Sequence, residues 1–274
     1  MLPAVAARLA RAVTPVIPHT EHNMHAIIGG TQTMTLPMLE GIRSEAVETP
    51  YGKPSGPVAV GVIGGREFAF LPRHGNPHML PPHKINYRAN LWALRKLGVT
   101  SVIAICTSGG LADRFGPGTI VCPDQIIDYT YGREHTLSDG LSEEPVVHVD
   151  FTIPFTGTLR QSLLNAALSA KVAVYDGGCY ACFNGPRLET AAEIRALARD
   201  GCDLVGQTMM PEAGLSRELG LDYAALCPIV NHAAGLGDSR NGISRAELRA
   251  TREAAMEQVM QLLVRFAQAE SAAT

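Results

Sequence analysis

The chain has 274 residues, a length that allows one large α/β domain or two small ones. Hydrophobic residues make up 46% of it and charged residues 18%, as expected of a globular protein with a sizeable core. The formal net charge of −3 provides no basic surface for nucleic acid, and no apolar run approaches the roughly 20 residues that cross a bilayer. We therefore expect neither nucleic acid nor a membrane as a partner.

The six cysteines are scattered along the chain, at Cys106, Cys122, Cys179, Cys182, Cys202 and Cys227. Several lie in apolar runs, and buried free thiols in a reducing cytoplasm account best for this pattern. Cys179 and Cys182 have the spacing of a C-x-x-C motif, but the sequence has no second pair to complete a metal site. We predict a cytoplasmic protein without a bound metal.

Residues 1–24 are predicted to form a loose N-terminal extension. They hold a short Ala/Arg pattern followed by prolines, and they lack the continuous apolar stretch of a signal peptide. Met24 lies directly before the first predicted strand and is an alternative start of the protein. Residues 25–274 contain no internal repeat and no convincing linker, so we expect them to form a single domain.

Two strands near the start of this domain end in residues that suit an anion. The strand at residues 26–28 is followed by Gly29-Gly30-Thr31, where a glycine pair can turn backbone N–H groups into one concavity beside a hydroxyl. A hairpin is predicted over residues 58–71, and Arg73 and His74 follow its second strand. The guanidinium of arginine has several N–H donors in a fixed planar arrangement that suits an oxyanion. The simpler alternatives are an ordinary turn and a pair of surface side chains.

A third pattern of this kind follows the next helix and strand. The helix is predicted from Asn86 to its stop at Gly98, and a buried strand at residues 102–105 comes after it. That strand ends in the Gly-rich hydroxyl loop 106–110, which contains Thr107. Three strand ends with anion-binding chemistry carry more weight together than any one of them alone.

The middle of the chain is predicted to hold strands at residues 119–121, 125–127 and 172–183, with helices at 159–169 and 191–200. The polar segment 128–147 has no regular pattern, and such a long loop is usually functional or packs on a partner. A long amphipathic helix, predicted from residue 245 to about 268, closes the chain.

Residues 202–235, before that helix, read as strand, loop, helix, strand and loop. In an open α/β sheet, ligands bind where the carboxyl ends of strands give way to loops. The sequence therefore predicts a site lined by Gln207, Thr208, Glu212 and Asn231. The alternative is an ordinary βαβ unit whose polar residues only cap and turn.

Five motifs follow one another along the chain: AIIGGT, RHG with HKINYRANLWAL, TSGGL, YACFNGPRLET and MMPEA. In their order and approximate spacing they resemble the purine nucleoside phosphorylase family, in particular its branch of methylthioadenosine and methylthioinosine phosphorylases. The resemblance covers nearly everything from Met24 onward. It implies a twisted, mixed central β-sheet flanked by helices, usually in a homotrimer. It also implies conversion of a purine nucleoside and phosphate into free base and ribose 1-phosphate, with phosphate as co-substrate and no cofactor.

The resemblance assigns residues to the phosphate and to the base. The positions that resemble phosphate-binding residues are Thr31, Arg73, His74, Thr107 and Thr208. Leu188 matches a residue that packs on the base, and Glu189 matches the glutamate that accepts the N1–H of a 6-oxopurine. Asn231 falls where 6-oxopurine enzymes carry asparagine and adenine-specific relatives carry aspartate.

Four further residues are assigned to the sugar and its 5′ pocket. Gln207 stands where a methionine typically lies under the sugar, and His148 resembles a histidine that reaches the 5′ pocket of a neighbouring subunit. Arg245 occupies a position where the methylthio branch typically has an apolar residue. Glu212 is expected either to orient its loop or to touch a ribose hydroxyl.

The implied mechanism follows from charge. Breaking the N-glycosidic bond leaves positive character on the ribose and negative charge on the departing purine. Phosphate held by Arg73 and Thr208 stabilises the first, and a donor on Asn231 at N7 stabilises the second, so these three are the predicted catalytic residues. Because Glu189 only accepts hydrogen bonds while Asn231 both donates and accepts, a 6-oxopurine is favoured over adenine.

Four positions depart from the family pattern: Gln32, Cys106, Gln207 and Arg245. Each is compatible with neutral drift, but four in one site indicate altered specificity or weakened phosphorolysis. The first hypothesis is a phosphorylase for a 6-oxopurine nucleoside, 5′-modified as in methylthioinosine. The second is a relative that holds a polar or anionic 5′ group on Arg245, or that hydrolyses its substrate. The third is a purine-binding trimer without turnover.

Overall fold

The computed structural model describes residues 24–30, 36–138, 140 and 146–272. Residues 1–23 of the predicted extension, and with them any test of that prediction, lie outside this range. Met24 is the first residue of the first strand.

One mixed sheet of twelve strands forms the centre of the protein. Its strands are β1 (Met24–Gly29), β2 (Glu40–Glu45), β3 (Val58–Ile63), β4 (Arg66–Pro72), β5 (Val99–Ile105), β6 (Ser108–Gly110), β7 (Ile120–Cys122), β8 (Gln125–Asp128), β9 (Val174–Asp176), β10 (Cys179–Cys182), β11 (Leu204–Gly206) and β12 (Asp222–His232). The main path runs β2-β3-β4-β1-β5-β12-β6-β11-β10-β8, while β7 pairs with β12 and β9. The predicted mixed α/β architecture is confirmed.

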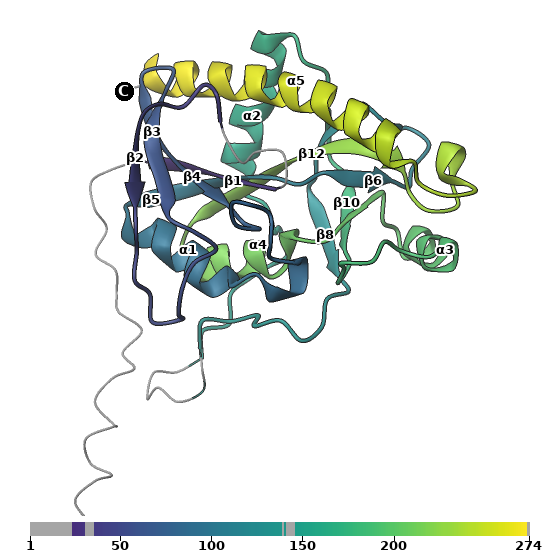
Figure 1. Cartoon of the computed structure of the whole chain (residues 1–274), viewed down its shortest axis with the longest axis horizontal. Coiled ribbons are helices and arrows are strands. Elements are labelled where there is room, and N and C mark those ends of the chain that lie inside the picture. Colours follow the sequence, from purple (N-terminus) through teal and green to yellow (C-terminus); the bar gives the residue numbers. More distant parts are fainter. Residues whose placement is uncertain (1–23, 31–35, 139, 141–145, 273–274) are drawn as a thin grey trace, which may run out of the picture.

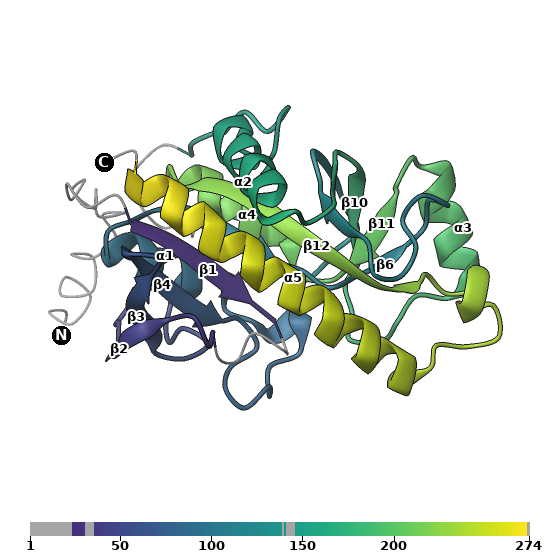
Figure 2. The same cartoon turned by 90° about the horizontal axis from the view of Figure 1, so that it is seen from above.

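Helices cover both faces of this sheet. They are α1 (Tyr87–Lys96), α2 (Gly157–Ala170), α3 (Ala191–Arg199), α4 (Met209–Glu218) and α5 (Arg245–Ala272), with short 3-10 turns η1 (Pro82–Lys84) and η2 (Gly237–Ser239). In Figure 1, α5 and α2 lie on one face and α1 and α4 on the other, while α3 stands beside the β10 end. Figure 2 shows α5 crossing the sheet along its length.

The apolar runs of the central strands explain this layering. All six residues of β1 are buried, as expected of a parallel strand covered on both faces. Neighbouring residues point to opposite faces, so Ile27 packs in the cluster with α2 and α5, while Ile28 packs in the cluster with α1 and α4. Because β4, β1, β5 and β12 are successive parallel neighbours, their carboxyl ends meet at one edge of the sheet.

Three segments differ from the sequence prediction. Residues 108–110, predicted to be loop, form β6 between β12 and β11, and a side chain at Gly110 would lie only 1.8 Å from a backbone oxygen. The strand predicted at residues 172–183 is split into β9 and β10 by Gly177 and Gly178, both at positive φ. The edge strand β2 was not predicted, because its largely exposed sequence has no apolar alternation.

Candidate active site

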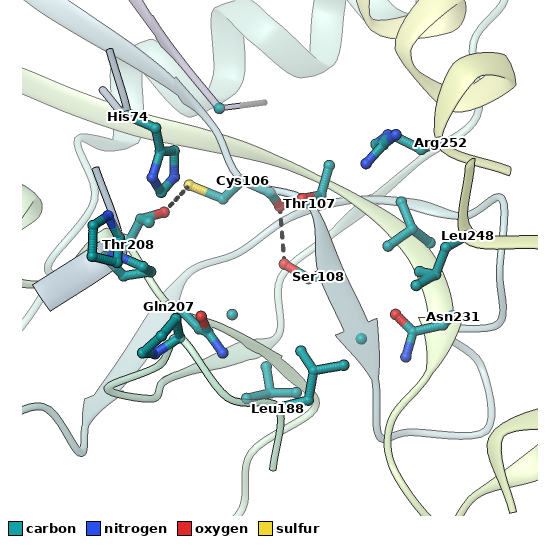
Figure 3. A pocket seen from close by; sticks show the side chains of 18 of the residues that line it. His74, Cys106, Thr107, Ser108, Leu188, Gln207, Thr208, Asn231, Leu248 and Arg252 are labelled. Atoms are coloured by element: carbon teal, nitrogen blue, oxygen red, sulfur yellow. Dashed lines mark hydrogen bonds between the residues drawn. The ribbon is translucent and has the colours of Figure 1, made fainter. Parts of the chain in front are cut away.

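A cavity of about 480 Å³ opens at the carboxyl edge of the central strands. Its walls come from the ends of β4, β5, β11 and β12, from the loop before α3, and from α5. Eight predicted site residues line it: Arg73, His74, Thr107, Leu188, Glu189, Gln207, Thr208 and Asn231. Figure 3 shows His74, Cys106 and Thr208 at one end of this cavity and Asn231, Leu248 and Arg252 at the other.

Four predicted residues are not placed in this cavity. His148 is exposed and is not among the lining residues. Glu212 is fully buried and also does not line the cavity. Thr31 and the side chain of Arg245 lie outside the described residues, as does Gln32.

Arg73 is held in place by a buried carboxylate beneath the cavity. Its Nε and Nη2 donate to Glu212 at 3.0 and 2.9 Å, and both side chains are only 1% exposed. Further bonds run from Nη1 to the Ile105 carbonyl and from Nη2 to the Ile28 carbonyl, at 2.8 and 3.1 Å. Because Nη1 carries a second N–H, the guanidinium keeps a donor for a ligand.

Glu212 holds Arg73 from outside the cavity. Of the two roles expected of Glu212, orienting its loop or touching a ribose hydroxyl, its position does not fit the second. Its carboxylate also accepts a hydrogen bond of 2.9 Å from the Tyr223 hydroxyl. Burial alone would lower the pKa of Arg73, but Glu212, together with Cys106 and Tyr223, offsets it and raises that pKa well above its usual value. This end of the cavity is therefore lined by a permanent cation whose charge is balanced by Glu212.

His74 lies next to Arg73 as a neutral side chain. Its Nδ1 is 2.7 Å from the Leu80 carbonyl, and since a carbonyl only accepts, Nδ1 carries the proton. Burial is the main cause that lowers the pKa of His74 to about 4, and nearby Arg73 and His78 add to the effect. The two histidine rings stack with centroids 4.1 Å apart. His74 thus keeps Nε2 as an acceptor at neutral pH.

The hydroxyls of this end come from two strand ends. Thr107 is exposed at the end of β5, whereas Thr208 is buried and its hydroxyl donates to the Cys106 sulfur at 3.6 Å. Ser108 donates to the Cys106 carbonyl at 2.9 Å, as drawn in Figure 3. Burial raises the pKa of Cys106, so this residue is a neutral thiol at the cavity wall.

Beside Thr208, Gln207 anchors the loop that carries Glu189 (Figure 3). Its Nε2 donates to the Arg187 carbonyl at 3.0 Å and lies 3.5 Å from Glu189 Oε1. Gly185, at φ +64°, makes room for this amide, since a Cβ there would lie 2.2 Å from Gln207 Oε1. Burial raises the pKa of Glu189. The Gln207 amide therefore holds the loop of Arg187 and Glu189 in place.

Asn231 stands opposite this loop on β12. Its Nδ2 donates to the His232 carbonyl at 2.5 Å, which fixes the orientation of the amide. One N–H and the amide oxygen are left for a ligand. Leu188, in the loop facing Asn231, is 52% exposed and provides an apolar surface on which a flat ring can pack.

The sequence interpretation missed two arginines. Arg133, in the polar segment before α2, donates to the carbonyls of Asn184 and Gln207 at 2.8 and 2.9 Å and so ties two cavity loops together. Arg252 of α5 lines the cavity itself. The sequence does contain a signal for Arg252, because it lies four residues after Leu248 and so shares its helix face.

Comparison with known proteins identifies the family. Residues 24–268 match the phosphorylase superfamily. The chain belongs to this family. It is 55% identical over 213 residues to the Probable S-methyl-5'-thioinosine phosphorylase of Xylella fastidiosa. The match covers 78% of this chain and 90% of the relative. It is 43% identical over 244 residues to the 6-oxopurine nucleoside phosphorylase of Pyrococcus furiosus, covering 87% and 90%.

Solved structures agree with this assignment. The methylthioadenosine phosphorylase of Schistosoma mansoni in complex with adenine superposes on this chain with a TM-score of 0.85, at 30% sequence identity. The superposition covers 92% of this chain and 93% of the S. mansoni chain. None of the helices in the described part is long and apolar enough to cross a bilayer. The described residues also contain no group of three or more His, Cys, Asp or Glu side chains able to hold a metal ion.

Proposed function

We propose that the protein catalyses the phosphorolysis of a 6-oxopurine nucleoside, giving free base and a ribose 1-phosphate. The observation that carries the proposal is the division of one cavity into two chemically different ends. Arg73, His74 and Thr208 supply donors and one acceptor at the first end, while Glu189 and Asn231 stand at the second. A nucleoside bound with phosphate needs this pairing. The relatives named as methylthioinosine and 6-oxopurine nucleoside phosphorylases support it.

The phosphate end suits an anion that carries one hydroxyl. Arg73 offers an N–H, Thr208 can offer its hydroxyl, and neutral His74 offers an acceptor for a P–OH group. Phosphate held there lies under the ribose, where its negative charge stabilises the positive character of the sugar in the transition state. It then adds to the anomeric carbon while the glycosidic bond breaks. Positioning and electrostatics supply the catalysis, without a covalent enzyme intermediate.

The base end selects the purine. Glu189 accepts the N1–H of a 6-oxopurine when ionised, and Asn231 donates to N7 as negative charge develops on the leaving base. Adenine lacks the N1–H, so it would leave an oxygen of the half-buried Glu189 without a donor. Inosine and S-methyl-5′-thioinosine are the candidate substrates, and purine or methylthio salvage in the cytoplasm is the proposed setting.

We also propose a homotrimer, with inorganic phosphate as co-substrate and no cofactor. The segment before α2 supports self-association because it exposes several large apolar side chains, namely Tyr131, Val146, Val147 and Ile153. Exposed His148 lies in the same segment, so it could complete the site of a neighbouring subunit.

Base release with and without phosphate tests the proposal. Purified protein is incubated with inosine, S-methyl-5′-thioinosine and S-methyl-5′-thioadenosine, and base and sugar phosphate are separated by chromatography. We expect hypoxanthine and a sugar 1-phosphate, formed only when phosphate is present. Release that ignores phosphate would indicate a hydrolase, and base binding without cleavage of any nucleoside would indicate a non-catalytic binding protein.

The base contact is tested by Asn231→Asp. A carboxylate accepts the N6 amino and protonated N7 hydrogens of an adenine leaving group, so the preference should shift toward adenine nucleosides. The readout is the ratio of kcat/KM for S-methyl-5′-thioadenosine over S-methyl-5′-thioinosine. An unchanged ratio would show that Asn231 does not contact the base.

A further inference from the structure

Arg252 is a half-buried cation in the cavity wall that forms no ion pair with any side chain in the described part of the chain. Its Nε is shielded from solvent and has no hydrogen-bond partner among the described residues. The described residues also place no carboxylate within ion-pair distance of it. Its helix neighbour Glu253 bonds Arg249 instead, at 2.9 Å. Burial lowers the pKa of Arg252, and the attraction of Glu253 is too weak to offset it.

Such an arrangement usually needs a ligand to complete it. A partly desolvated charge destabilises the folded protein unless it is paired and hydrogen-bonded. The same helix face carries Leu248, and Ile243 precedes it in the cavity wall. These apolar neighbours cannot satisfy the guanidinium. An oxygen acceptor on a ligand in the cavity would supply the missing partner.

The position of Arg252 indicates which part of the ligand it meets. In the proposed function, the base lies between Glu189 and Asn231 and the phosphate lies at Arg73, so the ribose bridges the two. The loop from His78 continues the phosphate end, because His78 stacks on His74. The wall formed by α5 is left for the exocyclic 5′ group. In Figure 3, Arg252 extends from that wall on the side of Thr107, opposite Gln207 and Leu188.

We propose that Arg252 binds an oxygen-bearing 5′ group of the nucleoside and makes the enzyme prefer an anionic or hydroxyl 5′ group over a methylthio group. The inference rests on the proposed function and names its substrate class. A thioether sulfur is a weak acceptor, a hydroxyl a good one, and a carboxylate accepts charge-assisted bonds from a guanidinium. The expected order of kcat/KM is inosine 5′-carboxylate, then inosine, then S-methyl-5′-thioinosine.

The test compares these three substrates in the wild type, Arg252→Met, Arg252→Lys and Arg249→Met, at saturating phosphate. We expect Arg252→Met to lower kcat/KM for the 5′-carboxylate by about 10- to 100-fold, the size of one hydrogen bond to a charged group. The kcat/KM of Arg252→Met for S-methyl-5′-thioinosine should equal or exceed that of the wild type. Arg252→Lys should recover part of the loss because it keeps the charge. Arg249→Met removes a cation from an exposed position of the same helix and should change nothing.

The outcomes distinguish the 5′ contact of Arg252 from the proposed phosphorolysis and from a contact of Arg252 with inorganic phosphate. If the wild type cleaves none of the three nucleosides, the proposed function fails and the inference fails with it. If it cleaves them but Arg252→Met leaves their ratio unchanged, only the inference is overturned. If Arg252→Met raises the KM for phosphate equally with all three nucleosides, Arg252 contacts the inorganic phosphate instead. That result would also overturn the proposed 5′ contact.

Discussion

Two arginines line the same cavity and differ in almost every physical respect. Arg73 is 1% exposed, faces the Glu212 carboxylate and donates to two backbone carbonyls as well. Arg252 is half-buried and forms no hydrogen bond or ion pair with a described residue, and Glu253 attracts it only weakly. The pKa of Arg73 is raised by its partner, whereas the pKa of Arg252 is lowered by burial.

The difference shows that residue type alone does not define a binding group. Arg73 is fixed by its partners and offers a ligand little beyond one preorganised N–H. Arg252 donates to no described residue, so its interaction with a ligand can be larger although its position is less constrained. The two arginines are therefore suited to different tasks, Arg73 to a fixed contact and Arg252 to a contact that depends on the ligand.

The largest effect is expected where the pairing of Arg73 is broken. Glu212→Gln keeps the shape of the side chain but leaves a buried guanidinium uncompensated, which should lower the free energy of unfolding by about 3–5 kcal/mol. Urea denaturation measures this change. Glu67→Gln is the matched control, since Glu67 forms an exposed 2.7 Å pair with Arg43 and should cost no more than about 1 kcal/mol. Equal losses of stability in both variants would show that the buried pair stabilises the protein no more than an exposed one.

A smaller effect is expected from pH at His74, the neutral neighbour of Arg73. Its pKa is about 4 in the folded protein and about 6.5 when unfolded, so the unfolded state binds more protons between these values. Stability is therefore fully present above pH 6.5 and falls as pH drops toward 4, by at most about 3 kcal/mol from this residue. Urea denaturation at several pH values should show a shallower loss in His74→Gln. Parallel curves for variant and wild type would rule out a depressed pKa.

Removing the unpaired arginine should act in the opposite direction to Glu212→Gln. Arg252→Met replaces a partly desolvated cation by an apolar side chain of similar length, so the free energy of unfolding should rise by about 1 kcal/mol. Thermal unfolding without ligand measures it. Arg249→Met, one turn away and exposed, should stay within about 0.5 kcal/mol of the wild type. A loss of stability in Arg252→Met would mean that the side chain has a partner in the protein.

The smallest effect comes from giving Arg252 a partner of its own. Leu248→Glu places a carboxylate four residues before it on the same helix face, the favourable order for such a pair. A double-mutant cycle with Arg252→Met should yield a coupling of about 0.5 kcal/mol. The same variant should lose the preference for an anionic 5′ group, whereas Leu248→Gln should retain it. A retained preference in Leu248→Glu would separate Arg252 from the 5′ pocket.

Much of the fold could be predicted because its signals are local. The apolar runs of β1 and β5, the helix capped by Asn86 and the amphipathic α5 follow directly from spacing and propensity. The short strand β6 could not be predicted this way. Its Ser-Gly-Gly sequence has no strand propensity, and it exists because β12 and β11 lie on either side to pair with it.

The sequence by itself determined the family, the polar strand ends and the cluster of Arg73, His74, Thr208 and Asn231 at one edge of the sheet. It did so because motifs and strand ends are encoded in neighbouring residues. Only the tertiary structure decided that Glu212 accepts hydrogen bonds from Arg73 and that Arg252 lines the cavity. Pairing and desolvation depend on groups far apart in the chain, 139 residues in the case of Arg73 and Glu212. Whether a charge is balanced or available is therefore a property of the fold.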